Sequence, residues 1–152
     1  MGLTFFSIIA TTTQNPQLDT LLDTNTPRNN WTLRTYSFWS TSSTYLTLKF
    51  TFQTDNKHEW YLDDVSVKSS TSTEMLTNGP FEDSIPLNGW TTGSSSCSPN
   101  SGLSILRSKS STRSYHHPCF GLGSRSWINQ SFVSNSNERY NISFWFFLDQ
   151  TS

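Results

Sequence analysis

The chain has 152 residues, of which 14% are charged and 14% aromatic, and its formal net charge at pH 7 is −1. Such a balanced charge gives no electrostatic reason to expect binding to nucleic acid or to an anionic membrane. Ser and Thr form about a third of the chain and are mixed with eleven Phe and six Trp. This composition favours short strands with polar outer faces over long helices, and the length is enough to bury one core.

Residues 1–10 contain an apolar run that begins at Leu3. We expect a strand here rather than a signal segment, because no basic residue precedes the run and no small-x-small cleavage pattern follows it. The run is also far too short to cross a bilayer. Residues 11–30 are polar and contain two prolines, which predicts a long loop with at most one short strand.

Strand patterns resume at residue 31. The aromatic residues of 31–39 change phase, which predicts a bulge or a strand that is buried on both faces. Residues 45–53 alternate cleanly and predict a half-buried antiparallel strand. Residues 55–57 predict a turn that joins this strand to the next, residues 60–67, as a hairpin. The core face of residues 45–53 is expected to carry Leu46, Leu48, Phe50 and Phe52.

A linker is expected at residues 69–74, because this Ser/Thr-rich run has nothing to bury. Asn78 and Gly79 then tolerate positive φ and predict a turn, after which Phe81 and Trp90 are expected in the core. Further along, the patterns predict a short strand at 103–106, a loop at 115–123, and strands at 126–133 and 140–148.

Two short motifs in the middle of the chain resemble the ends of galactose-binding-like jelly rolls, a superfamily that includes many carbohydrate-binding modules. Trp60-Tyr61-Leu62-Asp63-Asp64-Val65-Ser66-Val67 is similar to the closing strand of that fold, and Asn78-Gly79-Pro80-Phe81-Glu82, followed by Gly89-Trp90, is similar to its opening. The resemblance implies an all-β fold, an antiparallel β-sandwich of the jelly-roll type.

The closing motif precedes the opening one, so the resemblance implies a circular permutation or two half-repeats. Residues 1–68 would be the C-terminal half of one repeat and residues 75–152 the N-terminal half of the next. If the halves close on each other, residues 1–152 form a single β-sandwich, because termini that meet in space tolerate such a rearrangement. Otherwise each half needs the neighbouring repeats of a longer chain to cover its strand edges.

The resemblance also implies a structural calcium ion, held by Glu82 and by one or both of Asp63 and Asp64. Carboxylates are hard oxygen ligands that suit Ca²⁺, and backbone carbonyls of the turn at Asn78 would complete the coordination. The alternative is that these carboxylates cap turns or pair with Lys and Arg. Pro80 departs from the small or acidic residue that is more usual in the family.

Two cysteines, Cys97 and Cys119, lie in loop-like surroundings. In an extracellular protein they would form one disulfide worth on the order of 3 kcal/mol, and the alternative is two free thiols. Three sequons place candidate glycosylation sites at Asn30, Asn129 and Asn141. Together these features favour an extracellular or cell-surface location.

No catalytic constellation is apparent. Asp63, Asp64 and Glu82 are better explained at a strand edge than as a glycosidase pair in a cleft. His116 and His117 are adjacent, so they point in different directions, and no partner cluster at zinc spacing accompanies them; we expect a solvated loop there.

Binding is the remaining interpretation. Sugars stack their C–H faces on exposed aromatic rings, and amides or carboxylates bind the hydroxyl groups. Trp145 and Phe147 share a predicted strand face with Asn141. Trp39 and Tyr115 are further candidates for a glycan ligand. The sequence therefore predicts a non-catalytic, extracellular carbohydrate-binding domain, and the alternative is a structural or adhesive spacer repeat in which Trp145 and Phe147 pack under a loop or a neighbouring repeat.

Overall fold

The computed structural model describes residues 5–11, 17–22, 26–53, 58–95, 101–118 and 123–150. Within these ranges the chain forms strands and turns, and no helix. The strands are β1 (Phe5–Thr11), β2 (Gln17–Leu22), β3 (Thr32–Ser40), β4 (Thr44–Gln53), β5 (His58–Lys68), β6 (Thr91–Ser95), β7 (Gly102–Ser104), β8 (Ser114–His117), β9 (Arg125–Ser134) and β10 (Glu138–Gln150).

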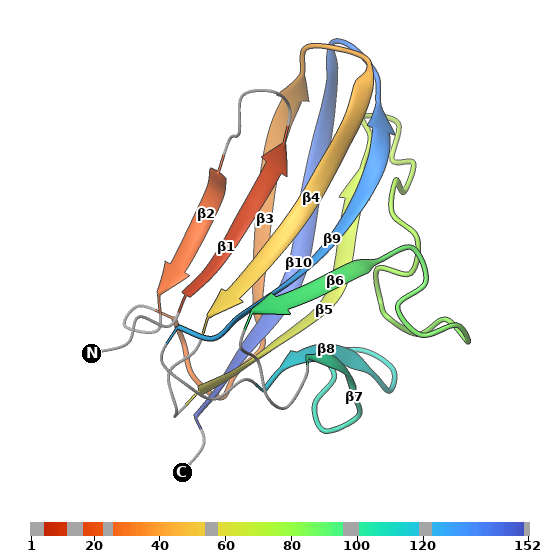
Figure 1. Cartoon of the computed structure of the whole chain (residues 1–152). Coiled ribbons are helices and arrows are strands. Elements are labelled where there is room, and N and C mark those ends of the chain that lie inside the picture. Colours follow the sequence, from red (N-terminus) through yellow and green to blue (C-terminus); the bar gives the residue numbers. More distant parts are fainter. Residues whose placement is uncertain are drawn as a thin grey trace.

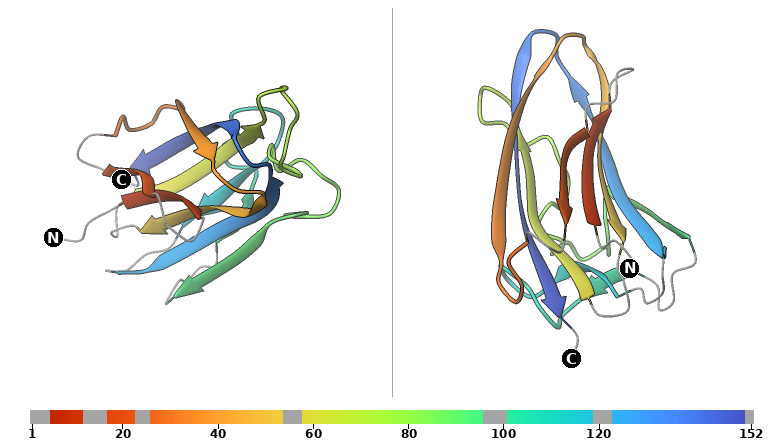
Figure 2. Two further views of the ribbon diagram at one scale, coloured as in Figure 1. Left: turned by 90° about the horizontal axis from the view of Figure 1, so that it is seen from above. Right: turned by 90° about the vertical axis from the view of Figure 1, so that its left-hand side faces the viewer.

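These strands form two antiparallel sheets that pack face to face (Figure 1 and Figure 2). The first sheet has the order β2-β1-β4-β9-β6, and the second has the order β3-β10-β5-β8-β7. The antiparallel β-sandwich expected from the sequence is confirmed. The strand β1 also agrees with the expectation of a strand near the start of the chain, and β2 is the one short strand expected within residues 11–30.

Both sheets contain strands from before and from after the 69–74 segment. In the first sheet β4 pairs with β9, and in the second sheet β10 lies between β3 and β5. Each half of the chain therefore covers strand edges of the other half. Whether the halves come from two repeats stays a prediction.

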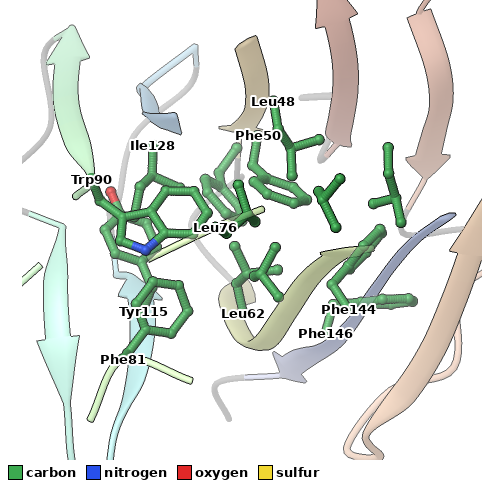
Figure 3. Close-up of a cluster of buried hydrophobic side chains, with 14 of the residues drawn as sticks. Leu48, Phe50, Leu62, Leu76, Phe81, Trp90, Tyr115, Ile128, Phe144 and Phe146 are labelled. Atoms are coloured by element: carbon green, nitrogen blue, oxygen red, sulfur yellow. The ribbon is translucent and has the colours of Figure 1, made fainter. Parts of the chain in front are cut away.

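Inward-facing side chains of both sheets fill the space between them (Figure 3). The alternation predicted for residues 45–53 is confirmed, because Leu46, Leu48, Phe50 and Phe52 of β4 are fully buried. Two rings placed in the core by the sequence, those of Phe81 and Trp90, are also buried, and their centroids lie 5.5 Å apart. From β10, Tyr140, Ile142, Phe144, Phe146 and Leu148 close the core.

The structure corrects three local predictions. Strand β3 alternates regularly and pairs with β10 without a bulge, and the side chains on its outward face are exposed instead of buried. Strands β4 and β5 do not form a hairpin, because they belong to different sheets and each carries buried aromatic rings to the shared core. Residues 114–117, expected in part as a loop, form β8 beside β5.

The segment after the linker lies along β5. The amide of Met75 donates to the carbonyl of Val67 at 2.8 Å, and the amide of Val65 donates to the carbonyl of Gly79 at 3.0 Å. A Cβ atom added at Gly79 would lie 1.8 Å from the carbonyl oxygen of Val65, so only glycine fits against this backbone. Asn78 has the positive φ predicted for the turn, 51°.

Candidate functional site

The outward face of the second sheet is polar in its middle and apolar at its ends. The pairs β3–β10 on this face run, from one end to the other, Trp39–Arg139, Ser37–Asn141, Thr35–Ser143 and Leu33–Trp145. Trp39 and Leu33 are six positions apart along an extended strand, so their Cα atoms are separated by about 20 Å. The face therefore has the length of an extended ligand rather than of a single small molecule.

A shallow groove of about 370 Å³ follows the middle of this face. We name it the β3–β10 groove. Within it, the hydroxyl of Ser37 donates to the Asn141 side-chain carbonyl at 2.7 Å, and the guanidinium of Arg139 donates to the Ser37 hydroxyl at 3.1 Å. The polar floor is thus held in place by its own hydrogen bonds. The groove is lined by Thr35, Tyr36, Ser37, Asn141, Ile142 and Ser143.

Aromatic rings lie at both ends of the groove. The side chain of Trp39 is 67% exposed, which is unusual for so large a ring. Trp145 is partly buried, and the ammonium of Lys109 lies 4.5 Å from its ring centroid in a cation–π contact. Leu33, the cross-strand neighbour of Trp145, is 43% exposed. These side chains give the groove two apolar ends and a polar centre.

Phe147, which the sequence placed among the ligand-binding residues, is only 5% exposed. The loop of residues 105–113 covers it: the Arg107 guanidinium lies 4.8 Å from the ring centroid and forms a 2.7 Å ion pair with Asp149. The ring of Trp31 packs beside it at 5.5 Å. Phe147 therefore packs under a loop, as the alternative interpretation of the sequence expected for this ring.

Tyr115, the fourth predicted binding residue, is fully buried. It belongs to β8 and packs in the core against Phe52 and Phe81, with centroid distances of 5.6 and 6.3 Å. Burial raises the pKa of its phenol. Its ring is therefore not presented to a ligand beside the groove.

A β-bulge in β5 places two of the predicted acidic residues, Asp63 and Asp64, beside the 105–113 loop. Strand β5 carries one extra residue relative to β10 at this point, and Asp64 has a positive φ of 48°. Asp63 accepts hydrogen bonds from the amides of Asp64 and Lys109, both at 2.7 Å, and Asp64 accepts one from the Ser110 hydroxyl at 2.5 Å. The bulge thus directs two consecutive carboxylates at the 105–113 loop. Burial raises the pKa of Asp63 to about 6.

Glu82 holds the other end of the same loop. It accepts hydrogen bonds from the amides of Thr112 and Arg113 at 2.9 and 2.6 Å and from the Thr112 hydroxyl at 2.7 Å. Burial acts to raise the pKa of Glu82, but these donors and the Arg113 charge outweigh it, so the pKa is lowered.

These contacts bear on the predicted calcium site. The described residues contain no group of three or more His, Cys, Asp or Glu side chains that could hold a metal ion. The oxygens of Asp63 and Glu82 face N–H donors, which have the wrong polarity to share a site with a cation. In this arrangement the carboxylates do not fit a calcium ion, and they hold the 105–113 loop instead. The metal site stays a prediction that chelation tests.

The two adjacent histidines lie in β8 and not in a solvated loop, and as expected they face opposite sides. His116 stacks on Tyr61 with 4.2 Å between centroids and lies 2.9 Å from a Glu59 carboxylate oxygen. His117 is fully buried, with its Nδ1 2.6 Å from the Ser126 hydroxyl and 3.0 Å from the Ser101 hydroxyl. Both therefore have structural contacts that account for them.

The structure describes the three predicted glycosylation sites but not the two cysteines of the predicted disulfide. Cys97 and Cys119 lie outside the described residues. Asn30 precedes β3 and is exposed, and Asn141 is exposed in the β3–β10 groove. Asn129 of β9 is partly buried. Glycosylation stays a prediction at all three positions.

Sequence reasoning missed part of the groove. Thr35, Ser37 and Arg139 share the two-residue spacing of Trp39 and Asn141 on their strands. A prediction of regular alternation for residues 31–39 would have placed Thr35 and Ser37 on the same face as Trp39. Arg139 was missed because the last strand was expected to begin at residue 140 and begins at Glu138.

No family model, no curated protein and no solved structure matches this chain. In the part of the chain that the structure describes, no helix is long and apolar enough to span a membrane.

Proposed function

We propose that this chain is a non-catalytic, extracellular carbohydrate-binding domain whose ligand lies along the β3–β10 groove. The observation that carries the proposal is the groove itself, an open polar strip with the exposed ring of Trp39 at one end and the partly buried ring of Trp145 at the other. Aromatic faces pair with the C–H faces of sugar rings, while hydroxyl and amide groups match the sugar hydroxyls.

The arrangement favours an extended ligand over a deeply enclosed one. The groove is shallow, and its polar side chains come from two neighbouring strands over about 20 Å. A chain of several sugar units could contact Trp39 at one end and Trp145 at the other while its hydroxyls meet Ser37 and Asn141. Of the four side chains proposed from sequence, we therefore keep Trp39 and Trp145 as ligand contacts.

A matched pair of variants tests the proposal. Trp39→Ala removes the exposed ring beside the groove, whereas Tyr45→Ala removes a 73% exposed ring from the outward side of β4, in the other sheet. A glycan array first identifies a ligand, and titration calorimetry then measures its affinity for each variant. Loss of a buried aromatic contact costs about 2 kcal/mol, so Trp39→Ala should weaken binding about 30-fold.

Tyr45→Ala should leave the affinity unchanged. Equal affinity in both variants would place the ligand elsewhere and contradict the proposal. If the folded wild-type protein binds no glycan on the array, the second candidate, a structural or adhesive spacer repeat, is favoured.

The spacer interpretation has one observation in its support. Arg107 and Trp31 cover Phe147, and Lys109 lies over Trp145, so much of the aromatic surface near residues 145–147 already has partners within the chain. A spacer would use exposed rings such as Trp39 against neighbouring repeats. In that case Trp39→Ala would weaken association between copies of the domain, measured by sedimentation, instead of sugar binding.

A further inference from the structure

The β3–β10 groove is bordered by three positive side chains. Arg139 lies beside Trp39 at one end of the groove, and Lys109 lies over Trp145 at the other end. Lys68 of β5 is the cross-strand neighbour of Asn141, on the side of β10 that faces β5. All three side chains are exposed. The chain as a whole has a net charge of −1, so this grouping is a local feature and not a reflection of the composition.

These cations lack acidic partners within the described part of the chain, where the ion pairs involve Arg107, Arg113 and His116 instead. The guanidinium of Arg139 contacts the neutral hydroxyl of Ser37. The Lys109 ammonium contacts the ring of Trp145. A cation with no anion beside it keeps its attraction for an anionic ligand.

The acidic side chains closest in sequence or register are held by other contacts. At the Lys109 end, Asp63 is the cross-strand neighbour of Trp145 and accepts hydrogen bonds from the amides of Asp64 and Lys109, and Asp64 accepts one from the Ser110 hydroxyl. Glu74 accepts hydrogen bonds from the Ser66 hydroxyl at 2.5 Å and from the amide of Val67 at 3.0 Å. Glu138 accepts hydrogen bonds from the Ser70 hydroxyl and from Asn135, at 3.0 and 2.7 Å. None of these four carboxylates forms an ion pair with the groove cations.

From this charge distribution we infer that the groove binds an acidic carbohydrate, one that carries carboxylate or sulfate groups. The inference rests on the proposed function and narrows its ligand class. Trp39 and Trp145 contact sugar rings, the hydroxyls and amide on the floor contact sugar hydroxyls, and Arg139, Lys68 and Lys109 contact the anionic groups. A guanidinium binds carboxylate or sulfate oxygens in a two-pronged geometry, so Arg139 is the cation that fixes the position of one acidic group.

The experiment compares matched acidic and neutral probes on the full chain. Three pairs serve: tetragalacturonate and its methyl ester, a heparin tetrasaccharide and its desulfated, N-acetylated form, and sialyllactose and lactose. We expect at least one acidic member to bind ten times more tightly than its neutral partner at 50 mM salt. That preference should shrink at 500 mM salt, because screening shortens the reach of exposed charges to a few ångströms.

Variants then assign the preference to the groove. The double variant Lys68→Gln/Arg139→Gln should lose the tenfold preference, so that the acidic and the neutral member of a pair bind it with equal affinity. Lys49→Gln, which removes a lysine from the outward side of β4 in the other sheet, should change neither. All of these side chains are at the surface, and a thermal melt checks that each variant folds.

The outcomes separate this inference from the function on which it rests. Equal binding of the acidic and neutral members overturns the acidic preference and keeps carbohydrate binding. If none of the six probes binds, the acidic preference is overturned. If the protein also binds no glycan on the array, carbohydrate binding is overturned as well. A preference that survives Lys68→Gln/Arg139→Gln, or tighter binding of a single-stranded oligonucleotide than of every acidic glycan, overturns the assignment to an acidic carbohydrate in this groove.

Discussion

His117 is a buried, uncharged histidine, and this makes the stability of the fold depend on pH. Its side chain has no exposed surface, and its ring stacks on Phe52 at 5.7 Å. Burial, together with a smaller contribution from the neighbouring His116, lowers the pKa of His117 from 6.5 to about 3. The folded protein therefore keeps this imidazole neutral at any pH above about 3.

The sign of the effect follows from proton uptake. Below pH 6.5 the unfolded chain protonates His117 while the folded chain does not, so stability that is fully present above pH 6.5 is lost as the pH falls toward 3. Each pH unit between the two pKa values is worth about 1.36 kcal/mol. From pH 7 to pH 4, His117 alone should thus remove roughly 3 kcal/mol, a large share of a typical stability of about 5–15 kcal/mol.

Asp63 acts in the opposite direction. Its folded pKa is raised from 3.8 to about 6, so the stability that it contributes is present below pH 3.8 and is lost as the pH rises through about 6. The two groups partly cancel between pH 4 and pH 6 in the wild-type protein. Variants are therefore needed to separate them.

Urea unfolding followed by Trp fluorescence at pH values from 4 to 7 measures both contributions. The free energy of unfolding of His117→Asn should fall less toward pH 4 than that of the wild type, and that of Asp63→Asn should fall more. An NMR titration of the wild-type His117 ring gives its pKa even if His117→Asn does not fold. A measured pKa near 6.5 would refute the reasoning, because it would mean that the ring is hydrated in the folded state.

Two further predictions concern the acidic residues and the groove. The melting temperature should be the same in calcium and in chelator, because N–H donors already occupy the oxygens of Asp63 and Glu82. A rise of several degrees with calcium would instead support a metal site, and it would require the 105–113 loop to move. Glycosylation at Asn141, detected by mass spectrometry after expression in a eukaryotic host, should block glycan binding by filling the groove. The same protein made in a bacterial host that attaches no glycan should bind, and unchanged binding by the glycosylated protein would contradict the position of the ligand.

The parts of the fold that the sequence predicted correctly are those where one local pattern has one physical cause. The alternation of apolar and polar residues in β4 indicates a strand with the core on one side and solvent on the other, so the sequence predicted which of its side chains are buried. The turn at Asn78 and the burial of Phe81 and Trp90 follow from short-range backbone chemistry. Strong local signals of this kind need no knowledge of which strand lies next to which.

The errors arise where the cause is distant in sequence. A turn between two strands looks the same whether it forms a hairpin or carries the chain from one sheet to the other, so the sequence did not distinguish these for β4 and β5. The same limit applies to the candidate site. Phe147 and Asp63 are covered by Arg107 and Lys109, which are 40 and 46 residues away, and no sequence pattern around residue 147 predicts that loop.

The pairing of early strands with late strands in both sheets has a consequence for the order in which the chain can fold. Strands β3 and β5 have no shared neighbour until β10 is synthesised, and β4 lacks one of its two partners until β9 appears. Most of the pairing is between residues far apart in sequence, which is the topology of slow folding. During translation β3, β4 and β5 therefore emerge with open edges, and a chaperone or a second nascent chain can occupy those edges before the later strands do.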